Sequence, residues 1–248
     1  MNPAIRRILI GGSPWMPLAL GSNLIAWWDA ERSDKISQSG GLVSSWIDLK
    51  NGYELTQANG TAKPTYGSMS FNGRPGITTD GVDDRLRSSA MPALFPLGAD
   101  PVWLWALVDQ FTGNSDGGNR DIIGYGDASA TANTRRLERG QSSGVSAAVM
   151  VVGTGSGSPV AVNGSAPFNG RHLVVGKIGT ASSEIRLDGA LGNSTTAAVP
   201  STNTGNVTVG GAPNGGSFFS GVINALLVTL PLQAADETRL SAYLNARK

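Results

Sequence analysis

The end of the chain constrains the fold most, because an apolar strand there runs into a single amphipathic helix. Residues 222–229 are almost continuously apolar and rich in β-branched side chains, which is typical of a buried strand. Pro231 follows, and the next segment has acidic residues in its first turns and basic residues in its last, an order that suits the helix dipole. Leu240, Tyr243 and Leu244 share one helical face, so we expect the helix to cover one edge of the core.

Asn-Gly and Asp-Gly pairs punctuate the rest of the chain, separated by β-branched and aromatic runs. These dipeptides tolerate the positive φ angles of tight hairpin turns. Residues 183–187, before Asp188-Gly189, alternate polar and apolar side chains as a half-buried strand does. The pattern predicts an all-β antiparallel sandwich or barrel. The pairs begin at Asn51, Asn59, Asn72, Asp80, Asp116, Asn163, Asn169, Asp188 and Asn214.

The strands follow from these boundaries. Residues 102–108 are nearly all apolar, and a strand is favoured over a helix there by Pro101 before them, Gly113 after them and their aromatic and β-branched content. The segments predicted as strands are 24–29, 42–48, 76–79, 85–89, 102–110, 121–125, 134–138, 145–152, 172–178, 183–187, 207–210 and 222–229.

The amino-acid composition limits the domain organisation and the classes of partner, but it does not identify a ligand. A chain of 248 residues can form one large β domain, with roughly 70% or more of its unfolded surface buried. It contains no cysteine, so disulfides, thiolate metal sites and a cysteine nucleophile are excluded. The net charge is +1 without any long run of like charge, which argues against nucleic acid and anionic membrane as partners.

Residues 1–21 form a distinct leader before a predicted domain at 22–248. Two arginines and three apolar residues imitate a secretion signal, but glycines and prolines interrupt the run before the roughly 7–15 apolar residues that a signal needs. No segment reaches the ~20 apolar residues of a membrane span. We expect either a simple leader or an arm that docks on a partner. The docking side chains would be Ile8, Leu9, Ile10, Trp15, Met16 and Leu18.

Catalytic patterns are weak, so the sequence predicts a protein that is not an enzyme and has no catalytic residues. His172 is the single histidine and stands at a strand start, where a structural role is usual. Residues 113–117 match G-x-S-x-G, but that motif requires a strand-to-helix turn that is not predicted here. Glycoside hydrolysis needs two carboxylates at a set separation. Glu184 and Asp188 share a face, but Asp188 lies in a turn.

An oxygen-rich loop offers the one metal candidate. Asn114, Asp116 and Asn119 carry the ligand types that Ca²⁺ prefers. The same residue types also form solvated turns, so both interpretations stay open. Tryptophans could stack on sugars, but Trp27 and Trp28 lie in an apolar strand. Adjacent strand residues face opposite sides, so one of the two must face a second layer, the arm or a partner. Only Trp15 looks free.

Short motifs at both ends of the chain follow one another in an order that is fairly specific for a fold. The motifs are LIAWWDA at 24–30, VSSWID at 43–48, KP at 63–64, NGRP at 72–75, DGVDDRL at 80–86, IRLDG at 185–189, VTVG at 207–210, FSGVIN at 219–224 and LSAYL at 240–244. With them the chain resembles the concanavalin A-like lectin and laminin G-like jelly-roll superfamily, in the branch found in bacteriophage virion and bacterial surface proteins. Thr79 stands where the family usually has phenylalanine.

The resemblance implies a two-sheet antiparallel jelly-roll sandwich with one short C-terminal helix. Its motifs set turns and core contacts and assign no glycan-binding residue. It implies a non-enzymatic virion component, such as a fibre, spike or decoration protein, that binds host-surface glycans for attachment. Such a protein would be oligomeric in an assembly and contact other virion proteins through the arm. The alternatives are a structural virion protein, a bacterial surface or extracellular location, and, less favoured, a glycan-cleaving enzyme.

Overall fold

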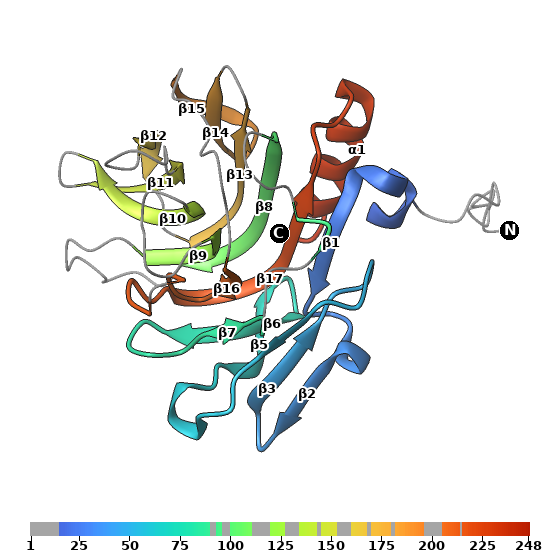
Figure 1. Cartoon of the computed structure of the whole chain (residues 1–248), viewed down its shortest axis with the longest axis vertical. Coiled ribbons are helices and arrows are strands. Elements are labelled where there is room, and N and C mark those ends of the chain that lie inside the picture. The colour runs from blue at the N-terminus through green and yellow to red at the C-terminus, as the bar shows by residue number, and fades with distance from the viewer. Residues whose placement is uncertain are drawn as a thin grey trace, which may run out of the picture.

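The structure is a computed structural model and is mostly β (Figure 1). No helix in the part of the chain that it describes is long and apolar enough to cross a membrane. The residues described are 15–89, 93–95, 100–110, 120–126, 134–142, 145–152, 160–167, 170–179, 182–195, 205–213 and 215–248, of which 68–70, 141–142, 145–152 and 160–167 are described by their backbone alone.

Each element is named by its place in the chain. The strands are β1 (Leu24–Asp29), β2 (Ile36–Ser39), β3 (Leu42–Ile47), β4 (Glu54–Thr56), β5 (Thr65–Phe71), β6 (Arg74–Asp80), β7 (Leu86–Arg87), β8 (Val102–Gln110), β9 (Arg120–Gly126), β10 (Thr134–Ser142), β11 (Val145–Val152), β12 (Val160–Pro167), β13 (Gly170–Ile178), β14 (Ser183–Leu187), β15 (Ala190–Thr195), β16 (Asn206–Val209) and β17 (Ser220–Thr229). The helices are η1 (Pro17–Asn23), η2 (Ser33–Lys35), η3 (Gly60–Ala62) and α1 (Ala234–Asn245).

The strands form two antiparallel layers. The first layer runs β1 and β6, β17, β8, β13, β14 and β15. The second runs β2, β3, β4, β7, β16, β9, β10, β11 and β12. Pairing of β5 with both β3 and β6 joins the layers, so hydrogen bonding continues through the described strands. The predicted all-β antiparallel sandwich with one short C-terminal α-helix is confirmed.

The main core lies between the two layers. It joins Trp28 of β1 and Leu104 of β8, from the first layer, to Trp46 of β3 and Ile123 of β9, from the second; all four are fully buried. Phe95 enters this core from the segment before β8. Burying this many large apolar side chains supplies the main stabilisation of the domain.

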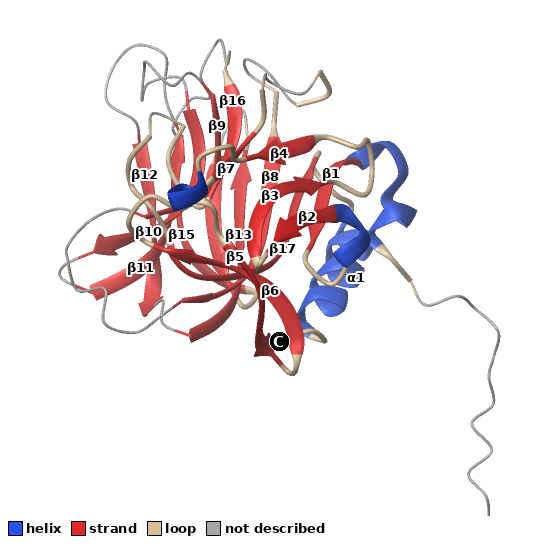
Figure 2. Ribbon diagram, turned by 90° about the horizontal axis from the view of Figure 1, so that it is seen from below, coloured by secondary structure: helices blue, strands red, loops and turns tan. Residues whose placement is uncertain are grey.

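A second core lies on the outer face of the first layer, beneath α1. Trp27 of β1 and Trp105 of β8 pack there against Leu240 and Leu244 of the helix. The helix therefore packs on part of the outer face of the first layer, beside β1, β17 and β8 (Figures 1 and 2). Because both faces of β17 are covered, all ten of its residues are buried. The expectation that Trp27 and Trp28 face different layers is confirmed.

A buried ion pair fixes the end of α1 to the end of β1. The guanidinium of Arg247 binds both carboxylate oxygens of Asp29, with Nη1 2.9 Å from Oδ2, and its Nη2 lies 2.7 Å from Oε1 of Glu31. Arg247 is 3% exposed and Asp29 is 4% exposed. Removing either partner of a buried ion pair is strongly destabilising, because it leaves an uncompensated charge inside the protein.

Candidate functional site

The outer face of the second layer carries a cross-strand row of polar side chains. Thr56 of β4 and Thr208 of β16 are both in register with Arg87 of β7. Gly124 of β9 is in register with Thr208, and Arg136 of β10 with Gly124. Residues opposite one another in antiparallel strands share a face. Strands lie about 4.7–4.9 Å apart, so the row places Arg87 roughly 14 Å from Arg136.

A polar groove of about 280 Å³ lies at one end of this row. It follows from the alternation of β7, in which Leu86 is fully buried in the core while Arg87 is exposed on the outer face. Each lining residue carries a hydroxyl, amide or guanidinium group. The residues that line the polar groove are Thr56, Gln57, Arg85, Arg87, Ser88, Ser89 and Asn206.

Hydrogen bonds to the backbone hold the strands around the polar groove. Gln57 donates from Nε2 to the carbonyl oxygen of Arg85 over 3.1 Å, and Thr56 donates from Oγ1 to that of Arg87 over 3.3 Å. The hydroxyl of Ser88 accepts the N–H of Val207 over 2.9 Å. The guanidinium groups take no part in these bonds. They are therefore left to bind a ligand rich in hydrogen-bonding groups.

Aromatic stacking positions one of the two arginines. The guanidinium carbon of Arg85 lies 5.9 Å from the ring centroid of Phe218. Gly215 is also close, since a Cβ atom there would stand 2.8 Å from Nη1 of Arg85. Gly215 has φ +90°, a conformation in which other residues are strained. This loop therefore restricts where Arg85 can point.

A buried cluster of charge occupies the other end of the row. Arg136 passes over Gly124, where a Cβ would lie 2.9 Å from Cγ of the arginine. Its Nη1 is 3.1 Å from Oδ2 of Asp121 and 3.5 Å from Oε2 of Glu138. Both acids are fully buried. A register shift next to Leu137 brings Asp121 of β9 opposite Glu138 of β10.

Burial raises the pKa of both carboxyl groups. Burial raises the pKa of Glu138 to about 9, and the neighbouring Asp121 adds to the rise. Burial also raises the pKa of Asp121, against the pull of Arg136. Asp121 lies closer to Arg136 than Glu138 does. Both oxygens of Glu138 are buried and accept no hydrogen bond from the residues that the structure describes, which disfavours its charged form.

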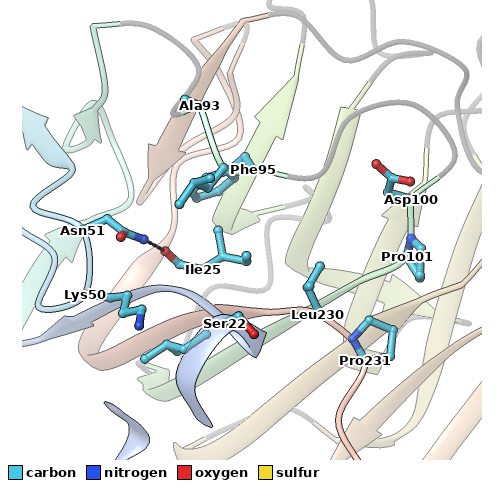
Figure 3. Close-up of a pocket in the computed structure, with 12 residues that line it drawn as sticks. Ser22, Ile25, Lys50, Asn51, Ala93, Phe95, Asp100, Pro101, Leu230 and Pro231 are labelled. Atoms are coloured by element: carbon cyan, nitrogen blue, oxygen red, sulfur yellow. Dashed lines mark hydrogen bonds between the residues drawn. The ribbon is translucent and has the colours of Figure 1, made fainter. Parts of the chain in front are cut away.

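A larger pocket of about 940 Å³ opens at the end of the sandwich near η1 (Figure 3). Ile25, Phe95 and Leu230 form its apolar centre, and Lys50 lies across it from Asp100 (Figure 3). The ring of Phe95 is 2% exposed because it packs on other aromatic rings, so it offers no stacking face. This apolar pocket suits an apolar or amphipathic ligand better than a hydroxylated sugar.

The residues predicted to dock on a partner fall in two groups. Ile8, Leu9 and Ile10 lie outside the described residues. Trp15 is not free, because its ring packs edge-on against Tyr243 of α1, with centroids 6.0 Å apart. The side chains of Met16 and Leu18 are 38% and 45% exposed. The docking role itself remains a prediction.

The predicted calcium ligands Asn114, Asp116 and Asn119 all lie outside the described residues. The structure brings together three other acids, Asp80, Asp83 and Asp84, whose ligand atoms lie within 4.8 Å of one another.

This acidic turn already uses its carboxylates. Asp80 accepts the N–H of Val82 over 2.8 Å, and Asp84 accepts the N–H of Asp80 over 3.0 Å. Burial and the charge of Asp80 raise the pKa of Asp84 to about 6. Turn formation accounts for these contacts, so they do not indicate a bound metal.

The structural role expected of His172 fits its contacts. Its Nδ1 lies 2.8 Å from Oδ2 of Asp188, whose other oxygen binds Nζ of Lys248 at 2.6 Å. Asp188 also accepts the N–H of Leu173 over 2.9 Å. These partners hold the pKa of Asp188 well below its usual range, despite burial that opposes the shift. The contacts tie β13 to the β14–β15 turn and to Lys248.

Comparisons with known proteins identify the fold and no family. No family model and no curated protein matches the chain. The enzymatically active domain of bacteriophage CBA120 tailspike protein 2 is 14% identical, with a TM-score of 0.52 over 75% of this chain and 30% of that one. Trypanosoma rangeli sialidase in complex with sialic acid is also 14% identical, with a TM-score of 0.57 over 95% of this chain and 34% of that one. The binding domain of Paraclostridial Mosquitocidal Protein 1 is 10% identical, with a TM-score of 0.61 over 92% and 53%.

The prediction that the chain is not an enzyme is contradicted by these comparisons, since the solved structures sharing its fold include a tailspike's enzymatically active domain and sialidases. The chain spans about a third of their length and about half of the toxin domain. The exclusion rested on the absence of a carboxylate pair along one strand. The fold instead pairs acids from two strands, Asp121 and Glu138.

Proposed function

We propose that this chain is a glycan-interacting domain of a phage-type virion protein, and that the polar groove holds the sugar. The polar groove carries the proposal, because all seven of its lining residues bear polar side chains. Hydroxyl, amide and guanidinium groups match the donors and acceptors of a sugar ring. The shared fold of a phage tailspike domain and of a domain named for binding supports the phage and binding parts of the proposal.

The location, the partners, the docking segment and the superfamily of the protein are further parts of this proposal. We place the protein on the virion, with other virion proteins and host-surface polysaccharide as partners, and an extracellular location as the alternative. Residues 1–21 would dock the domain on the assembly. A concanavalin A-like or laminin G-like relationship is consistent with the sandwich. Calcium stays a prediction for the loop that contains Asp116.

Processing of the bound glycan is a second candidate function. Asp121 and Glu138 are neighbouring acids whose pKa is raised by burial, and a carboxyl group of raised pKa is the general acid that glycoside hydrolysis uses. Both are fully buried, so a reaction would require the covering residues to move. Any turnover should therefore be traced with Glu138→Gln, which removes the titrating proton and preserves the shape of the side chain.

Filling the polar groove tests the binding function. Ser89 is an exposed residue in its lining, and a tryptophan there should obstruct a sugar without disturbing the core. We expect Ser89→Trp to weaken binding at least 10-fold to a polysaccharide selected from a panel of bacterial surface glycans. Immobilised polysaccharide and soluble protein give the affinity, and released reducing ends give turnover in the same samples.

The matched control places tryptophan on the other side of the sandwich. Ala235 is exposed on α1, which packs on the outer face of the first layer. Ala235→Trp should bind like the unmodified chain. Equal binding by Ser89→Trp, or failure of every polysaccharide in the panel to bind, would contradict the proposed function and favour a role in subunit contacts.

A further inference from the structure

The polar groove contains two arginines whose charge is not neutralised. Other described arginines bind side-chain carboxylates, among them Arg32, Arg74, Arg136, Arg186, Arg239 and Arg247. Arg85 and Arg87 have no acidic partner among the residues that the structure describes, although the chain as a whole is nearly balanced in charge. Unpaired guanidinium groups in one groove produce a local positive field.

The backbone brings these two cations onto one face. Arg85 and Arg87 flank Leu86, whose side chain points into the core, so the two arginines share the outer face of the second layer. Phe218 supports the guanidinium of Arg85, and the backbone of Arg87 is fixed by Thr56. Strand pairing therefore positions Arg87, and the ring of Phe218 positions Arg85.

Uncharged groups complete the lining. Ser89 and Asn206 are exposed and partly exposed residues at the same polar groove, and Gln57 is partly exposed beside Arg85. A hydroxyl and two amides can bind ring hydroxyls, while planar guanidinium groups favour carboxylates through paired N–H donors. The combination matches a sugar ring that carries an acid group.

We infer that the polar groove recognises an anionic sugar, a uronic or sialic acid residue of an acidic polysaccharide, through Arg85 and Arg87. The inference rests on the proposed function, to which it adds the charge of the ligand. A volume of about 280 Å³ is close to the lower limit of small-ligand pockets, so it suits one sugar unit of a polymer.

A nucleic acid is a less suitable anion. Binding along a phosphate backbone requires many cations spread over a surface, whereas this chain has a net charge of +1. The site instead provides a local pair of arginines among neutral hydrogen-bonding groups. This favours one acid group in an otherwise hydroxylated ligand.

Binding to acidic polysaccharides and to their carboxyl-reduced forms tests the inference. Uronic acid polymers and polysialic acid are each compared with the same polymer after reduction of its carboxyl groups, and dextran serves as a neutral polymer. We expect at least one acidic polymer to bind 10- to 100-fold more tightly than its reduced form, as for a hydrogen-bonded charge pair. Arg85→Gln/Arg87→Gln should lose most of this difference and most of the salt dependence. Arg239→Gln, on the opposite side of the sandwich, should retain both.

The outcomes separate this inference from the proposed function. Binding of neutral and reduced polymers as tightly as acidic ones, lost in Ser89→Trp, would overturn the anionic preference and leave the glycan function standing. Failure of all glycans to bind would overturn both. Equal competition by single-stranded DNA would overturn the sugar assignment, and an acidic preference retained by the double variant would place recognition elsewhere. A circular dichroism spectrum and thermal transition like those of the unmodified chain would show that the double variant is folded.

Discussion

Replacing Arg247 with methionine should destabilise the domain by about 3–5 kcal/mol, because it removes one partner of a buried ion pair. Asp29 would remain almost completely buried with its negative charge unpaired. The chain would also lose the contact between Arg247 and the ring of Tyr243. For a domain of this size the midpoint of thermal unfolding should fall by roughly 6–20 °C. Urea unfolding measured by tryptophan fluorescence gives the free energy directly.

Two variants separate buried charge from helix composition. Arg239→Met removes an exposed ion pair with Asp236 from the same helix and should change the free energy of unfolding by less than about 1 kcal/mol. Adding Asp29→Asn to Arg247→Met removes the stranded charge and should recover part of the loss. Equal effects of Arg247→Met and Arg239→Met would contradict the buried anchor.

Stability should fall as pH rises from 6.5 to 9, and Glu138→Gln should reduce the fall. The pKa of Glu138 is raised from 4.5 to about 9, so in this interval the folded chain holds a proton that the unfolded chain has released. The contribution is fully present below pH 4.5 and is lost as pH rises through about 9. Its slope is at most about 1.4 kcal/mol per pH unit.

The choice of pH interval and of control variant separates the contribution of Glu138 to stability from those of other titrating groups. Asp84, with its pKa raised to about 6, contributes mainly below the interval. Other titrating groups are common to both proteins and cancel in the difference between Glu138→Gln and the unmodified chain. Glu54→Gln, at an exposed position, should leave the slope unchanged. Urea unfolding at pH 6.5, 7.5 and 9 measures the slope, and parallel lines for Glu138→Gln and Glu54→Gln would contradict the raised pKa of Glu138.

The sequence predicts the strands that alternate or are strongly apolar. Predicted and observed limits coincide for β1, β8, β11 and β14. Hairpin turns are equally readable, since Asn72 and Asp188 adopt the positive φ angles, 50° and 53°, that their Asn-Gly and Asp-Gly pairs predict. These features depend on local conformational preferences, which a sequence carries directly.

The strands that the sequence did not predict are β2, β4, β5, β12 and β15. β2 and β4 have few apolar residues, and β15 has no buried residue. Their pairing is stabilised by neighbouring strands rather than by their own composition. The sequence also did not predict which surface α1 covers. Its apolar face indicates that the helix packs on the protein, but not that it packs on the outer face of the first layer.

The candidate site was not predicted, for a similar reason. Thr56, Arg87 and Asn206 come from three distant segments that meet only when β4, β7 and β16 pair. Arg85 lies within the motif DGVDDRL and Arg87 directly after it, and the resemblance carried by that motif concerns the scaffold. The alternation around Leu86 was a usable indication that both arginines share a face. Likewise, Asp121 and Glu138 are brought together by a register shift that local patterns do not reveal.

The location of a bound glycan tests the central claim most directly. Amide chemical shifts of the labelled chain, followed during titration with an oligosaccharide of the tightest-binding polymer, report which residues contact it. The largest changes should occur at Thr56, Arg87, Ser89 and Asn206 in the polar groove. Changes centred instead on Ile25, Asn51 and Leu230, in the apolar pocket of Figure 3, would contradict the assignment of the site.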